Sequence, residues 1–101
     1  MSIDVVLERE RGEAMDRVID RYSDLASIWP IEDASFPLLQ FLDQYGNTIF
    51  NRNQMAQVLR ELKSLAEKSE TDEQKVLLHR IEELAIRCRD SFHLYLRFRG
   101  D

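Results

Sequence analysis

Two amphipathic segments in the second half of the chain constrain its fold more than any other feature. The first has apolar residues at steps of three and four: Met55, Val58, Leu59, Leu62, Leu65 and Ala66. This spacing places them on one face of a helix. Asn51 can cap that helix with Gln54 as its capping-box partner, although Asn53 could provide the cap instead. We therefore predict a helix over residues 52–68.

The second segment opens with another capping-box pair, Thr71 and Gln74, and two acidic residues follow in the first turn, where the helix dipole favours them. Its apolar stripe consists of Leu77, Ile81, Leu84, Ala85 and Cys88. Glu83 and Arg87 are spaced to form an ion pair on the outer side. We predict a helix over residues 72–90. Because only a few residues join the two helices, an antiparallel αα-hairpin with facing stripes should result.

The remaining elements have the patterns of short strands. Apolar and polar residues alternate in residues 3–8 and again in 94–98, as in strands with one buried face. The apolar run at 38–42 and the pair at 49–50 flank the turn-forming residues 43–47, which indicates a hairpin of strands at 38–43 and 48–50. A small antiparallel sheet of these strands would pack against the helices. The predicted class is α+β, with an all-α fold as the alternative.

Residues 13–29 allow two interpretations. Apolar residues from Met15 to Trp29, including Tyr22, fit a helical stripe that Pro30 ends. Alternatively, Gly12 forms a turn, residues 13–18 pair with the first strand, and the helix shortens to about residues 21–29. Both interpretations place one further helix before Pro30.

The length and the charge limit the function. We expect one domain over residues 1–101, because this length suits one modest core. The N-terminus does not have the pattern of a signal sequence, and the chain contains no long apolar run and a single Cys, so we expect a cytoplasmic protein with no membrane partner. The net charge of −5 argues against nucleic acid as a partner and favours a basic protein.

The sequence offers little for catalysis. It has no Gly-rich phosphate loop and no paired-Cys or His-Glu metal motif, so we predict no enzyme activity, no cofactor and no metal. Cys88 belongs to an apolar stripe and should be buried, which argues against a nucleophilic pair with His93. His79 should be exposed. The aspartates at 16, 20 and 24 would share one face if their segment is helical, and a solvated face is the simpler interpretation.

The best candidate for function is a polar cluster around the expected turn at 43–47. Its members are Asp43, Tyr45, Asn47, Asn51, Arg52 and Gln54, joined by Arg97 and Arg99 if the last strand enters the same sheet. Asp43 and Asn47 can shape the turn, Asn51 can cap a helix, and Arg52 can pair with Asp43 or Asp101. Tyr and Arg are also the residues enriched at interface hot spots, so the cluster is a candidate partner surface.

From residue 36 onward the chain contains SFPLLQFLDQYGNTIFNRNQM, then LAIRC and a terminal HLYLRFRGD. This order resembles a group of small uncharacterised bacterial proteins that end in Tyr-Leu-Arg-Phe-x-Gly-Asp. The resemblance covers most of residues 36–101, is weaker before them, and implies no particular activity.

Size and acidity suggest a small acidic protein-binding module, such as an immunity- or antitoxin-like inhibitor of a basic partner. One alternative is a non-catalytic homodimer formed through apolar surface on the helices. A small ligand-binding domain is another, and it would show a deep pocket with convergent titratable groups.

Overall fold

The computed structural model describes residues 2–21 and 24–100, which form an α+β fold. Four antiparallel strands form the sheet, in the order β2-β1-β4-β3. Their bounds are β1 Ile3–Arg9, β2 Ala14–Val18, β3 Asn47–Asn51 and β4 Leu94–Gly100. The two central strands, β1 and β4, come from opposite ends of the chain, so the sheet depends on contacts between residues far apart in sequence.

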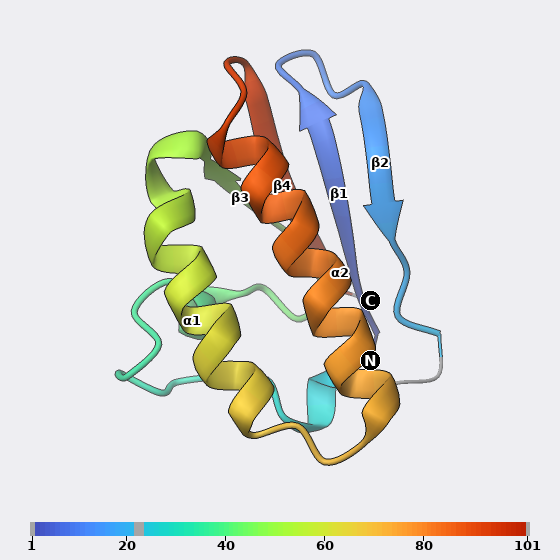
Figure 1. Cartoon of the computed structure of the whole chain (residues 1–101), viewed down its shortest axis with the longest axis vertical. Coiled ribbons are helices and arrows are strands. Elements are labelled where there is room, and N and C mark those ends of the chain that lie inside the picture. Colours follow the sequence, from blue (N-terminus) through green and yellow to red (C-terminus); the bar gives the residue numbers. More distant parts are fainter. Residues whose placement is uncertain (1, 22–23, 101) are drawn as a thin grey trace.

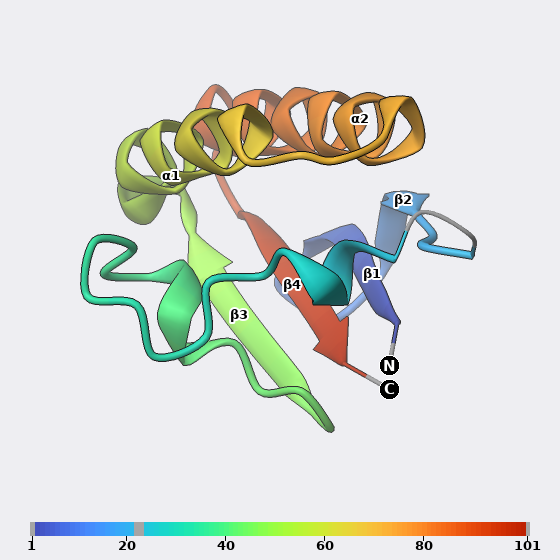
Figure 2. The same cartoon turned by 90° about the horizontal axis from the view of Figure 1, so that it is seen from below.

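Two helices, α1 Met55–Glu67 and α2 Asp72–Arg89, pack side by side as the predicted αα-hairpin and cover one face of the sheet (Figures 1 and 2). Both predicted capping boxes are present. Asn51 Oδ1 accepts from the N–H of Asn53 at 2.9 Å, and Thr71 Oγ1 accepts from the N–H of Gln74 at 3.1 Å. The first box starts a 3-10 turn over Arg52–Gln54, which leads directly into α1.

The core lies between the helices and the inner face of the sheet. Leu7, Leu96 and Phe98 are fully buried there beneath Leu62 and Ile81 of the helices. The segment from residue 24 to residue 42 closes one end of this layer (Figure 2) and contributes further buried side chains: Leu25, Trp29, Phe36, Leu39 and Leu42. Burial of this apolar surface is the main stabilising contribution to a domain of this size.

The hairpin interpretation of residues 13–18 is confirmed, because residues 14–18 form β2 and pair with β1. Gly12 permits the turn, because its φ of +87° is unfavourable for other residues. The further helix before Pro30 was predicted wrongly, since the described residues of this segment contain a 3-10 turn over Leu25–Ser27 and no α-helix; Tyr22 lies outside the described residues. The three aspartates therefore share no helix face, because Asp16 lies in β2 and Asp24 takes a left-handed backbone conformation.

The predicted strand at 38–43 is also wrong. Leu39–Phe41 is a 3-10 turn that buries Leu39 and exposes Phe41, and β3 pairs with β4 instead of with this segment. A buried carboxylate explains the difference. Glu61 of α1 accepts hydrogen bonds from the N–H groups of Leu38 and Leu39, at 3.0 and 2.8 Å. Backbone groups bonded to a helix side chain in this way are not available to a strand ladder.

One predicted surface ion pair is replaced by a tertiary one. Arg87 contacts Asp16 of β2 at 2.7 Å, and Glu83 contacts the exposed His79 at 3.3 Å. The N–H of Arg17 and the guanidinium of Arg87 bond to the Asp16 carboxylate and lower its pKa. The contact attaches the outer strand of the sheet to α2.

Candidate functional site

The predicted partner cluster is divided between the two ends of β3. At one end, Asp43 Oδ1 accepts from the N–H of Tyr45 at 2.9 Å, and the Tyr45 side chain is 83% exposed. The turn packs closely on the last strand, since a Cβ at Gly100 would lie 2.4 Å from the Asp43 carbonyl oxygen. These residues form a turn, as the sequence predicts. The turn does not join two paired strands, because β3, which follows it, pairs with β4.

Arg52 and Gln54 lie at the other end of β3. The Arg52 guanidinium lies 4.4 Å from the centre of the Phe92 ring and donates to the Arg89 carbonyl at 3.4 Å. Gln54 Oε1 accepts from the N–H of Asn51. The expected pairing of Arg52 with Asp43 does not form because β3 separates them, and Asp101 lies outside the described residues. Arg52 and Gln54 thus join α1 to the segment after α2.

The face of the sheet opposite the helices brings the other members together. Within the described residues, no helix or strand covers this face (Figure 2), which we call the open face. The strand pairings place side chains on it in rows. One row contains Arg17, Val6, Arg97 and Ile49, and the next contains Asp4, Arg99 and Asn47. Three predicted residues, Asn47, Arg97 and Arg99, are therefore neighbours on one surface.

Arg97 is fixed at the centre of the open face by Glu8. Its Nη2 and Nε atoms lie 2.7 and 2.9 Å from Glu8 Oε1, and the Glu8 side chain is only 9% exposed. The carboxylate raises the pKa of Arg97 further, so the guanidinium stays charged. This pair separates two adjoining hollows of about 430 and 400 Å³.

The two hollows differ in character. Arg17 and Arg99 line the larger one, and among the described residues neither guanidinium forms a hydrogen bond or an ion pair. Ile49, which is 49% exposed, and the half-buried Tyr95 line the smaller one. The open face thus combines unpaired cations, a fixed ion pair and apolar side chains.

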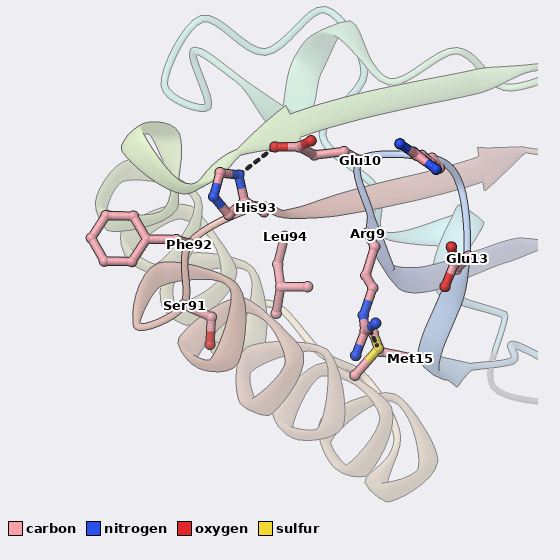
Figure 3. A pocket seen from close by; sticks show the side chains of 9 residues that line it. Arg9, Glu10, Glu13, Met15, Ser91, Phe92, His93 and Leu94 are labelled. Atoms are coloured by element: carbon pink, nitrogen blue, oxygen red, sulfur yellow. Dashed lines mark hydrogen bonds and ion pairs between the residues drawn. The ribbon is translucent and has the colours of Figure 1, made fainter.

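A third hollow, of about 550 Å³, lies at one end of the sheet (Figure 3). Residues 9–11, 13 and 15 of the β1–β2 hairpin form one wall, and residues 91–94 after α2 form the other. Nδ1 of His93 pairs with Glu10 Oε1 across it, and the Arg9 guanidinium contacts the Met15 sulfur at 3.1 Å. We call this hollow the hairpin pocket.

The geometry at Cys88 argues against a nucleophile. The thiol is fully buried, as predicted, and donates to the Leu94 carbonyl at 3.5 Å. Burial raises its pKa to about 11, so it is a neutral thiol near pH 7. His93 is paired with Glu10, and His79 is on the exposed side of α2.

Within residues 2–21 and 24–100, no group of three or more His, Cys, Asp or Glu side chains is arranged to hold a metal ion. In the same part of the chain, no helix is long and apolar enough to cross a membrane.

Comparison of this chain with protein-family models, with curated proteins and with solved structures gave no match.

Sequence reasoning missed Arg17 and Glu8 as parts of the open face. The signal was present in one interpretation of residues 13–18, because a strand there points Arg17 to the same side as Val6 and Arg97. A helical interpretation of the same residues gives no such relation. Only the pairing of β2 with β1 distinguishes the two.

Proposed function

We propose that this chain is a small, non-catalytic protein-binding module and that its partner docks on the open face. The observation that carries the proposal is the combination of two guanidinium groups, Arg17 and Arg99, which are unpaired within residues 2–21 and 24–100, with apolar side chains on the open face. Interfaces typically pair an apolar centre with polar surroundings, and Tyr and Arg are prominent among their energetic anchors. The open face has this composition.

The charges of the open face favour acidic groups on the partner. Three arginines and two carboxylates, Asp4 and Glu8, project from it, whereas the whole chain has a net charge of −5. Guanidinium groups bind carboxylates through paired, charge-assisted hydrogen bonds. We infer that the partner offers Asp or Glu side chains to Arg17 and Arg99. The net charge of the whole chain favours a basic partner. Such a partner would instead bind the more acidic surface outside the open face.

An inhibitory role of the immunity or antitoxin type is consistent with such a surface. Arg97 is already held by Glu8, and its position is fixed by two central strands. A rigid, preformed surface loses little conformational entropy on binding, which favours tight association. The module would act by covering the partner's own functional surface, so it needs no reactive group.

The test compares two double variants that change the charge equally. Arg17→Glu with Arg99→Glu reverses the open face, whereas Lys63→Glu with Lys75→Glu reverses two exposed lysines on the helices. Proteins captured from a lysate of the source cells by the parent chain are identified, purified and titrated by calorimetry. We expect the open-face variant to bind the captured partner at least about tenfold more weakly, and the helix variant to bind like the parent.

Each alternative gives a different result. Equal affinity of the parent and the open-face variant would exclude the open face as the docking surface. Loss of binding in the lysine variant alone would indicate a basic partner on the helix side. If light scattering shows that the parent is a dimer and that the open-face variant is a monomer, the occupant of this face is a second copy of the chain. Circular dichroism of both variants checks that the fold is retained.

A further inference from the structure

The hairpin pocket combines a cation that lacks a strong partner with exposed apolar side chains. We propose that it binds small amphipathic carboxylates, with the carboxylate on Arg9 and the apolar part against Met15 and Leu94. Its volume of about 550 Å³ lies within the range of small-molecule sites, about 300–1,000 Å³. Arg9, Glu10 and Arg11 also line the smaller hollow of the open face, so the two sites adjoin, but this proposal does not depend on the proposed protein partner.

Arg9 is available to an anion. Its one described side-chain contact is Nε to the Met15 sulfur, and a thioether is a weak acceptor. The Glu10 carboxylate pairs with His93, apart from the contact between Arg9 and Met15 (Figure 3). The charged groups Arg9 and Arg11 are matched in number by Glu10 and Glu13 at the pocket, so the preference for an anion rests on Arg9 itself, whose one described side-chain partner is a thioether. A single ligand carboxylate would give this guanidinium the strong acceptor that the described residues do not supply.

The pocket also offers unusual apolar exposure. Met15 is 42% exposed and Leu94 is half-buried beside the core, while the ring of Phe92 lies against Arg52 and points away from Arg9 and Met15 (Figure 3). Methionine adapts its shape to irregular apolar partners. An aromatic or short aliphatic group placed here would cover surface that the fold leaves in contact with water. The apolar walls therefore select the body of the ligand, and Arg9 selects its charged end.

The two walls are held together before any ligand arrives. His93 has a φ of +65°, which is uncommon for a residue with a side chain, and its ring pairs with Glu10 of the hairpin. Unfavourable backbone conformations persist where the surrounding structure fixes them, and they concentrate at functional sites. The β1–β4 ladder pairs Arg9 with Leu94, and the His93–Glu10 contact adds to it, so the loop after α2 stays beside the β1–β2 hairpin and the pocket is preformed.

The test uses 4-phenylbutyrate and its uncharged counterpart 4-phenyl-1-butanol, each titrated into the ¹⁵N-labelled chain and followed by two-dimensional NMR. We expect saturable shifts at the amides of residues 9–15 and 91–94, with the acid binding about tenfold more tightly than the alcohol because of its charge-assisted hydrogen bonds. Arg9→Gln should remove this preference and leave binding of the alcohol unchanged. Met15→Gln should weaken both ligands.

Arg17→Gln, on the open face, is the matched control and should bind both ligands like the parent. Equal affinity for the acid and the alcohol in the parent chain would overturn the proposal, as would shifts confined to the open face. The comparison of the acid with the alcohol in the parent chain tests the proposal even if the Arg9 variant does not fold. If the open-face charge reversal abolishes partner binding but leaves phenylbutyrate binding intact, the two sites are independent.

Discussion

Glu61 lies on the inner side of α1 and holds the segment before β3 in place. Its side chain is 2% exposed, and Oε1 accepts from the N–H groups of Leu38 and Leu39. Oε2 is buried without a hydrogen-bond partner among the described residues. We predict that the two accepted hydrogen bonds, rather than the charge or volume of the side chain, account for its contribution to stability.

Two substitutions separate these contributions. Glu61→Met keeps the size of the side chain but removes the acceptor, so it leaves two N–H groups unpaired, each at a cost of about 1–3 kcal/mol. Removing a carboxylate with one unsatisfied oxygen offsets part of this cost. We expect a net loss of about 2–4 kcal/mol in the free energy of unfolding. Glu61→Gln retains the acceptor oxygen and should lose at least about 1 kcal/mol less than the Met variant.

Urea denaturation measures both variants, and an unchanged dependence on urea shows that the two-state comparison is valid. Amide exchange at Leu38 and Leu39 gives a local readout. It should accelerate in Glu61→Met and remain near the parent rate in Glu61→Gln. If the Met variant is as stable as the Gln variant, or more stable, the two hydrogen bonds do not hold this segment in place.

Leu62→Ala and Ile81→Ala should each reduce the free energy of unfolding by about 2–5 kcal/mol, because both side chains are fully buried. Denaturation checks this against Val76→Ala, whose side chain is 60% exposed, and a loss no larger than that of the control would contradict the packing. Cys88 should react slowly with a thiol reagent in the native chain at pH 8 and quickly in urea; rapid native labelling would place it at the surface. Because burial raises the Cys88 pKa from 9.0 to about 11, its contribution to stability is present below pH 9 and is lost as the pH rises to about 11. Two pKa units correspond to about 2.7 kcal/mol, and this loss should be absent from Cys88→Ala.

Local patterns were sufficient where an element depends mainly on its own residues. The helices were predicted within a few residues, because a capping box satisfies N–H groups at the helix start and a stripe at steps of three and four has one geometric explanation. The strands at 3–8 and 94–98 followed from alternation in the same way. In both cases the deciding atoms lie within a few residues of each other along the chain.

The candidate site was less predictable because it depends on which strands are neighbours. Alternation along the last strand predicts that Arg97 and Arg99 lie on its solvent-exposed face, as they do. Arg17 joins them only through the pairing of β2 with β1. Tyr45 and Arg52 are close in sequence, but β3 lies between them and advances about 3.3 Å per residue, so they lie at its opposite ends. Residues that are close in sequence can therefore lie far apart in space when an extended strand separates them.

The sequence alone determined the αα-hairpin, the burial of Cys88 and the α+β class, since each follows from periodicity and capping. Tertiary structure decided the rest. Residues 38–42 are compatible with a strand, and Glu61, more than twenty positions away, binds their backbone instead. Residues 14–18 are compatible with a helix, and β1 binds them as a strand. Where a short segment has two conformations of similar free energy, hydrogen bonds and apolar contacts from distant residues select one, and a single sequence does not display those contacts.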